Sequence, residues 1–185
     1  MKIKDRIEGD KINLRFITKG DALSIYQYAA DEAISRYTHI PHPYNLDDAY
    51  DFVKLTQSDR KRKAAYHYGL ENRETGQIIG MIGLIALFPM HRKAELGYWL
   101  AKPFWGRGII TEAIEKIVEF AFVTLKLHRV YAHVFPDNKA SIRVLEKCGF
   151  TREGLIREGF VQRGKYVSVY MYSILEDEWA KRDLT

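Results

Sequence analysis

The chain has 185 residues, 46% of them hydrophobic and 29% charged, with a formal net charge of +5 and a pI of about 9.2. This length suits one globular domain, residues 1–185, and no apolar run approaches the ~20 residues that a membrane span needs. The basic residues are scattered among 24 acidic ones, which argues against nucleic acid as a partner. The N-terminus lacks the apolar stretch of a signal peptide and the single cysteine, Cys148, cannot form an internal disulfide, so we expect a cytoplasmic protein.

The first third of the chain has clear helix-start signals. Thr18 lies three residues before Asp21, a spacing typical of a capping box, and Asn45 or Asp47 can cap a later helix. Alternating apolar residues before Thr18 are typical of a strand, and two prolines interrupt the stretch before Asn45. The predicted elements are a strand at 11–17, a helix that follows Thr18 and ends at about residue 30, a loop at 37–44 and a helix that ends in a basic run at 60–63.

The rest of the chain alternates between strand and helix patterns, and its clearest helix carries apolar residues at helical spacing over 110–125. The predicted elements are strands at 65–71, 77–87 and 93–100, the helix at 110–125, a strand at 129–135, a helix at 139–148, strands at 151–160 and 166–175, and a short helix at 176–182. This order predicts an α/β (α+β) fold in which a mixed sheet of seven strands carries helices on both faces.

Two glycines, Gly106 and Gly108, stand between a predicted strand and the clearest helix. A helix N-terminus presents free N–H groups, and glycine lets the backbone approach a phosphate closely, so this turn can cradle an anion. The sequence lacks the ending of a P-loop and the third glycine of a dinucleotide fingerprint. Taken alone, a tight turn that binds nothing explains the two glycines equally well.

Three segments in order carry a family resemblance: ELGYWLAKPFWGRGIITEA at 95–113, NKASIRVLEKCGF at 138–150 and EGLIREGFVQRGKYVSVYMYSIL at 153–175. Over about residues 12–179 the chain closely resembles the GNAT acetyltransferases and, within them, the RimJ/RimL type that acetylates ribosomal-protein N-termini. The resemblance implies a mostly antiparallel sheet that is splayed at its centre to admit acetyl-CoA, which is the acetyl donor, and it implies no metal.

The resemblance also implies which residues hold acetyl-CoA. The glycine turn matches the family's pyrophosphate loop, although Trp105 replaces the usual Gln or Arg and Ile110 replaces a small residue. The strand before it matches the one that pairs with the pantetheine arm, and Asn138 matches an asparagine that bonds this arm. The cofactor-binding residues implied in this way are Leu100, Ala101, Trp105, Gly106, Arg107, Gly108, Ile109, Ile110, Asn138 and Ser141.

Transfer of an acetyl group to a primary amine by direct attack on the thioester needs a base for the amine and an acid for the departing thiolate. Glu95 is the candidate base, through water, although it could merely pair with a neighbouring cation. The tyrosine that many family members use as the acid is Leu145 here. Ser141 matches the serine given this role in the RimL type and is the candidate acid, although it could serve only to bind the cofactor or cap a helix.

The acceptor is predicted to be a protein N-terminal α-amine, such as a ribosomal-protein serine or alanine. The acceptor site is expected to involve Tyr37, His39, Tyr44, Arg157 and Tyr166. Two alternatives stay open: a small-amine acetyltransferase such as a spermidine N-acetyltransferase, and a non-catalytic module that binds acyl-CoA or nucleic acid. Cys148 is expected to be a buried structural thiol. A homodimer is open, since the sequence does not reveal the oligomeric state.

Overall fold

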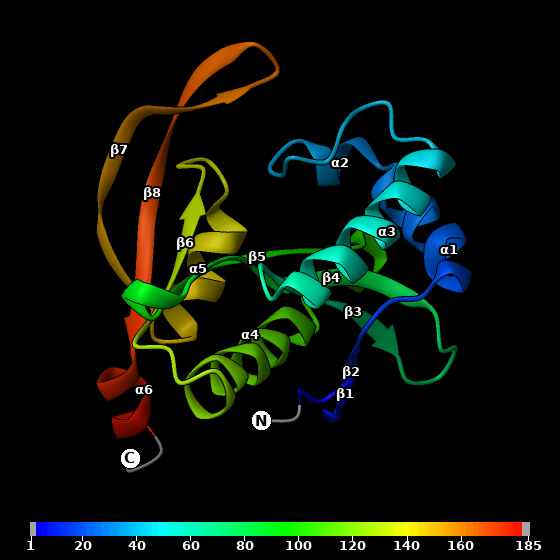
Figure 1. Cartoon of the computed structure of the whole chain (residues 1–185). Coiled ribbons are helices and arrows are strands. Elements are labelled where there is room, and N and C mark those ends of the chain that lie inside the picture. Colours follow the sequence, from blue (N-terminus) through cyan, green and yellow to red (C-terminus); the bar gives the residue numbers. More distant parts are fainter. Residues whose placement is uncertain (1–2, 183–185) are drawn as a thin grey trace.

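A computed structural model describes residues 3–182, so the first two and last three residues of the predicted domain lie outside the described residues. One sheet of eight strands runs through the molecule in the order β1-β2-β3-β4-β5-β6-β8-β7 (Figure 1). The strands are β1 (Arg6–Ile7), β2 (Ile12–Arg15), β3 (Tyr66–Asn72), β4 (Ile78–Phe88), β5 (Lys93–Leu100), β6 (Arg129–Val134), β7 (Thr151–Gln162) and β8 (Lys165–Leu175). The predicted mixed, mostly antiparallel α/β fold is confirmed.

The predicted count of seven strands is wrong by one, because β1 pairs with β2 at the edge of the sheet. A strand of two residues is too short to show an alternating pattern, so only its pairing with β2 reveals it.

The helices lie close to their predicted positions. They are α1 (Ala22–Ala29), α2 (Glu32–Ser35), α3 (Leu46–Arg62), α4 (Ile109–Glu119), α5 (Lys139–Lys147) and α6 (Glu176–Arg182). The capping box at Thr18 and Asp21 is present, and a second one at Asn45 and Asp48 starts α3. The four-residue α2 is an addition to the prediction, and it begins where the Asp31 side chain accepts a hydrogen bond from the Ala33 N–H.

The predicted helix over 110–125 changes character near its end, where α4 passes into a π-helical turn, η4 (Phe120–Thr124). Phe120 packs against Tyr66, with 5.5 Å between ring centroids, and Phe122 packs against Trp179 at 5.6 Å. The wider turn lets both phenylalanines be buried against different partners.

The sheet contains one parallel pairing, between β5 and β6, and it is short. Residue pairs run from Lys93 opposite Arg129 to Glu95 opposite Tyr131 and then stop, although both strands continue. By contrast, β5 pairs with β4 from Lys93 to Leu100, which is the whole length of β5. The second half of β5 therefore has a neighbour on one side only, and the sheet opens between β5 and β6 as predicted.

Two hydrophobic clusters cover the two faces of the sheet. The larger one joins α4 and α5 to residues such as Leu96 and Leu100 of β5, and the smaller one joins α1 and α3 to residues such as Met81. Trp99 packs against the smaller cluster, which places it on the opposite face from Leu100. The clusters thus show which face of β5 each side chain occupies.

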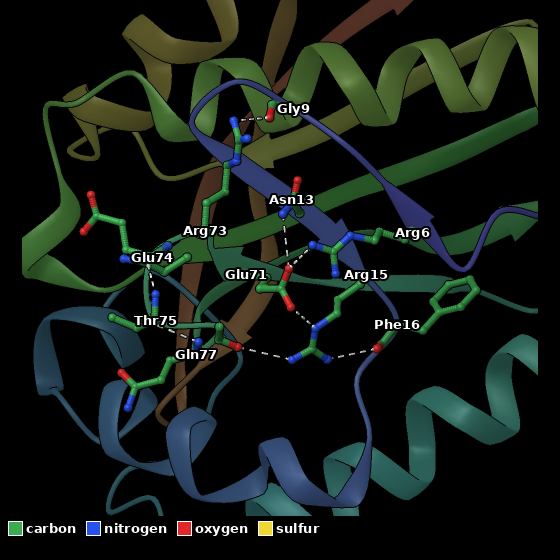
Figure 2. Close-up of polar contacts among 12 residues, drawn as sticks. Arg6, Gly9, Asn13, Arg15, Phe16, Glu71, Arg73, Glu74, Thr75 and Gln77 are labelled. Atoms are coloured by element: carbon green, nitrogen blue, oxygen red, sulfur yellow. Dashed lines mark hydrogen bonds and ion pairs between the residues drawn. The ribbon is translucent and has the colours of Figure 1, made fainter.

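A network of charged side chains ties β2 to β3 (Figure 2), and Arg15 extends it to Asp21 at the start of α1. Arg15 donates to both carboxylate oxygens of Asp21, at 2.7 and 2.9 Å, and to Glu71 at 2.6 Å. Glu71 also accepts from Asn13 at 3.2 Å and pairs with Arg6 at 2.7 Å. Burial by itself would raise the pKa of Asp21 and of Glu71, but these hydrogen bonds outweigh it and lower both pKa values.

Between residues 3 and 182, no helix is long and apolar enough to cross a membrane.

Candidate functional site

The glycine turn before α4 has the geometry of an anion cradle. Gly106 and Gly108 have φ angles of 74° and 75°, a left-handed conformation that favours glycine, and Gly108 is the N-cap of α4. No atom lies within 4 Å of the position that a Cβ of Gly106 would take, so the turn is open on that side. The indole N–H of Trp105 donates to the Leu100 carbonyl at 2.6 Å and ties the turn to the end of β5. These residues fit a pyrophosphate group, as predicted for acetyl-CoA.

A cation from a distant part of the sequence reaches the same turn. The Lys11 ammonium lies 2.8 Å from the position that a Cβ of Gly108 would take. The Lys11 backbone N–H donates to both carboxylate oxygens of Glu112, in the first turn of α4, at 3.1 and 3.2 Å. No sequence signal pointed to Lys11, because its contacts join residues about 100 positions apart. Lys11 adds positive charge where the helix N-terminus is already positive.

Beyond Glu95, the backbone of β5 is outside the ladder with β6, and its groups on that side face the opening of the sheet. The Ala101 N–H donates to the Ile79 carbonyl on the β4 side, at 2.9 Å. Because successive N–H groups of a strand point in opposite directions, the backbone groups of Leu100 face the opening. The Leu100 carbonyl is taken by Trp105, and its N–H is left facing the side where the pantetheine arm is predicted to lie.

The start of α5 holds the second part of the predicted site. The Asn138 side-chain oxygen accepts the Ser141 N–H at 3.1 Å, so Asn138 caps the helix and keeps its amide nitrogen for another partner. The Ser141 hydroxyl lies 2.6 Å from the Tyr98 hydroxyl of β5. Burial raises the pKa of Tyr98, so this phenol stays protonated and can donate a hydrogen bond to Ser141. Leu145, at the family's tyrosine position, is fully buried in the core.

Tyr98 was not among the predicted site residues. The only sequence signal for it is its distance of three residues from Glu95, which places the two on opposite faces of a strand. Its partnership with Ser141 depends on the packing of α5 against the sheet.

Glu95 has a partner that the sequence did not reveal. Its Oε1 atom lies 2.9 Å from Nδ1 of His133 on β6, whereas the expected alternative was an ion pair with a nearby cation such as Arg92 or Lys93. The Glu95 and His133 side chains are 23% and 15% exposed. Glu95 is also the last residue of β5 that pairs with β6, so its carboxylate stands where the sheet begins to open.

The two candidate catalytic groups approach this opening from opposite faces. Odd-numbered residues of β5 share a face with Trp99, which packs toward α1 and α3, and Glu95 belongs to this set. Tyr98 and Leu100 point to the other face, which is covered by α4 and α5 and carries Ser141. An acyl group lying in the opening could therefore meet Glu95 on one side and Ser141 on the other.

The predicted acceptor residues are dispersed. The Tyr37 hydroxyl donates to Asp137 at 3.2 Å, in the turn between β6 and α5. Tyr44 is buried in the smaller core cluster, where burial raises its pKa to about 12. His39 and Tyr166 are exposed, and Arg157 lines an open hollow beside Glu158. The structure thus brings Tyr37 alone of these five residues into contact with the turn that precedes Asn138.

Side chains at the tip of the β7–β8 hairpin, which lies on the same side of the molecule as α2 (Figure 1), contact the C-terminal end of α2. The Gln162 side chain donates to the Arg36 carbonyl at 2.8 Å, and Arg163 donates to the Ser35 hydroxyl at 3.0 Å. Tyr37 in the loop after α2 also reaches Asp137. This loop therefore contacts both the β7–β8 hairpin and the turn between β6 and α5. These contacts form a rim beyond the opening.

The structure also describes the surroundings of the single cysteine and of the groups that could bind a metal ion. Cys148 is buried, as expected, and burial raises the pKa of its thiol to about 12. Within residues 3–182, no group of three or more His, Cys, Asp and Glu side chains is arranged to hold a metal ion.

Comparisons with known proteins agree with the resemblance read from the sequence. Residues 11–151 match the model of the acetyltransferase (GNAT) domain. The chain is 35% identical to the uncharacterized N-acetyltransferase YoaA of Bacillus subtilis, over 92% of this chain and 96% of that protein. It is 27% identical to the spermidine N(1)-acetyltransferase of Vibrio cholerae, over 93% and 97% of the two chains.

A solved structure shares the fold at lower identity. RimL, a ribosomal L7/L12 alpha-N-protein acetyltransferase in complex with coenzyme A, superimposes with a TM-score of 0.84 at 21% identity, over 94% of this chain and 99% of that chain. At this identity the likeness concerns the fold.

Proposed function

This chain belongs to the GNAT acetyltransferase family and takes its acetyl group from acetyl-CoA, and we propose that it transfers this group to the α-amine of a protein N-terminus. The observation that carries the proposal is the placement of Glu95 and Ser141 on opposite faces of one opening in the sheet. A non-catalytic acyl-CoA module would have no use for a carboxylate and a hydroxyl arranged in this way.

In the proposed reaction, the amine nitrogen attacks the thioester carbonyl carbon, and the carbon–sulfur bond then breaks. Glu95 accepts the amine proton, directly or through water, and coenzyme A leaves as its thiolate. Ser141 donates a hydrogen bond to the departing sulfur, and Tyr98 donates a hydrogen bond to Ser141. The free N–H of Leu100 faces the opening and can stabilise the developing oxyanion. The glycine turn, Lys11 and Asn138 hold the rest of acetyl-CoA on the α4 and α5 side.

An N-terminal amine suits a carboxylate base. The pKa of an α-amino group is about 8, against about 10.4 for a lysine side chain, so an N-terminus needs less help to lose its proton near neutral pH. A thiolate with a pKa near 8.5 leaves readily, so the demand on Ser141 is modest as well.

Four carboxylates in α2, at the start of α3 and in the turn before α5 already have partners within the protein, which leaves them less available to bind a polyamine. Glu32 pairs with Arg163 at 3.5 Å, and Asp137 pairs with Arg36 at 3.8 Å. Asp31 caps α2 and Asp48 caps α3, so both have local partners. A polycation would have to compete with these arginines and helix N-termini, which favours the N-terminal amine over spermidine.

An acceptor screen tests the proposal. Purified protein and labelled acetyl-CoA are incubated with peptides that begin with Ser, Ala or Met, with the same peptides blocked at the N-terminus, with lysine peptides and with spermidine. We expect label on the free Ser or Ala N-terminus and none on the blocked peptide. Preference for spermidine would replace the proposed acceptor, and failure of acetyl-CoA to raise the melting temperature would contradict the whole assignment.

The cellular location, the domain extent and the oligomeric state are proposed from the sequence. A cytoplasmic location, one domain over residues 1–185 and a possible second copy as partner remain expectations from the sequence. Size-exclusion chromatography with light scattering would measure the oligomeric state directly.

A further inference from the structure

His133 takes no part in the reaction described so far, yet it contacts the proposed base. Its Nδ1 atom lies 2.9 Å from Glu95 Oε1, and both side chains are mostly shielded from solvent. A carboxylate can only accept a hydrogen bond, so this contact requires that Nδ1 carry the proton. In the neutral imidazole the other nitrogen, Nε2, is then the acceptor.

The surroundings of His133 fix its ring. Phe160 of β7 lies against it with 4.8 Å between ring centroids, and Tyr131 lies 5.5 Å away on the same strand. Tyr131 pairs with Glu95 in the parallel ladder, so His133 stands two residues further along β6, on the same face and beyond the last paired residue. The imidazole is therefore held by β6 and β7 at the edge of the opening.

The charged and titratable groups around this pair are few. Glu95 faces His133 from β5, Tyr131 lies beside it on β6, and β7 contributes the apolar Phe160. Two cations lie over the Tyr131 ring: the Lys93 ammonium at 5.8 Å and the Arg129 guanidinium at 5.9 Å from its centroid. Among these groups, His133 is the one that the structure places in hydrogen-bond contact with Glu95.

We propose that His133 is the positioning residue of the base: it donates its Nδ1 proton to one carboxylate oxygen of Glu95 and thereby holds the other oxygen toward the amine. This inference rests on the proposed function, in which Glu95 takes the amine proton. A group that orients a base acts through geometry, and a misplacement of about 1 Å can cost on the order of 100-fold in rate.

The chain supplies a matched control. His67 on β3 also contacts a carboxylate, with its Nε2 atom 3.3 Å from Asp59 of α3, and its side chain is similarly buried at 11% exposure. Burial lowers the pKa of His67 despite this contact. This pair lies away from the opening between β5 and β6, so a histidine–carboxylate pair with a purely structural role should behave as His67 does.

The kinetic test compares His133→Phe, His133→Asn and His67→Phe with the N-terminal peptide as acceptor. We expect His133→Phe to lower kcat by about 10-fold to 100-fold and to change KM for acetyl-CoA by less than about two-fold. His133→Asn, whose amide can replace the Nδ1 donor, should restore kcat to within about three-fold of the wild type. His67→Phe should keep the wild-type kcat. In a Glu95→Gln background, His133→Phe should have no further effect.

Three results would overturn the inference: wild-type kcat in His133→Phe, an equal loss with and without Glu95, or an Asn variant as slow as the Phe variant. A second measurement does not depend on turnover. Nitrogen-15 NMR of the wild-type protein at pH 8 should show His133 protonated at Nδ1, and Glu95→Gln should perturb that signal. Protonation at Nε2 would refute the proposed bond even if no acceptor were turned over, whereas a wild-type protein with the Nδ1 signal and no activity would contradict the proposed function alone.

Discussion

Two glutamates of the same sheet, Glu71 on β3 and Glu95 on β5, are held in opposite ways. The Glu71 side chain is 11% exposed and is bound by Arg6, Arg15 and Asn13, and these three partners together lower its pKa against the effect of burial. Among residues 3–182, the hydrogen-bond donor to Glu95 is His133, and the Glu95 side chain is 23% exposed at the edge of an opening. A carboxylate whose oxygens are filled by cations is fixed as an anion and cannot act as a base. A carboxylate with a single hydrogen-bond donor keeps an oxygen free for a substrate proton.

The largest expected effect is a loss of stability when Asp21 and Glu71 lose the arginine that they share. Arg15→Leu should lower the free energy of unfolding by about 3 kcal/mol, because it leaves Asp21 without its bidentate partner and Glu71 without one of its donors. Urea unfolding followed by tryptophan fluorescence measures this. The surface pair of Arg62 and Asp59 is a control, and Arg62→Leu should cost less than about 1 kcal/mol.

The same variant has a defined pH dependence. The folded-state pKa values of Asp21 and Glu71 are lowered, so the stabilisation is complete above the unfolded values near 4 and is lost as pH falls through the folded values. The difference between wild type and Arg15→Leu should therefore shrink when unfolding is measured at pH 3 instead of pH 7. A difference that stays constant over this range would show that Arg15 acts through packing alone.

The next largest expected effect is a loss of activity when the Glu95 carboxylate is replaced. Glu95→Gln should lower kcat by about 100-fold at pH 6 to 7, where the acceptor amine is mostly protonated, and by less at pH 9. Because Glu95 has one donor and is partly exposed, the unfolding free energy should change by less than about 1 kcal/mol.

Glu119→Gln, an exposed change on α4, is the matched control for this variant. Rates of Glu95→Gln that equal the wild type between pH 6 and 7 would remove Glu95 as the base. A loss of stability as large as that of Arg15→Leu would make Glu95 a structural carboxylate like Glu71.

The smallest expected effect lies on the opposite face of the opening. Ser141→Ala should lower kcat by about 10-fold and leave KM for acetyl-CoA nearly unchanged, because the thiolate leaves readily even without its donor. The variant also leaves the Tyr98 hydroxyl without its partner, which should cost about 1 kcal/mol of stability.

The double variant Ser141→Ala with Tyr98→Phe separates these two losses. Removing both hydroxyls should return most of the stability but none of the rate. An effect of Ser141→Ala on acetyl-CoA affinity alone would instead make Ser141 a binding residue.

The sequence by itself determined what depends on near neighbours. Alternation and helical spacing located all but the two-residue β1 among the strands, and all but the four-residue α2 among the helices. Side-chain caps such as Thr18 with Asp21 depend on residues three apart and were therefore visible in the chain. The glycine turn at Gly106 and Gly108 was visible for the same reason, since its left-handed conformation is a local property.

Only the tertiary structure decided which of these local features work together. Lys11 reaches Gly108, His133 reaches Glu95, and Tyr98 reaches Ser141, and each contact joins elements that are far apart in sequence. Strand periodicity states which face a side chain occupies, but it does not state which strand lies alongside. The short parallel pairing of β5 with β6 supplies that information, and the point where it ends at Glu95 is where the sheet opens.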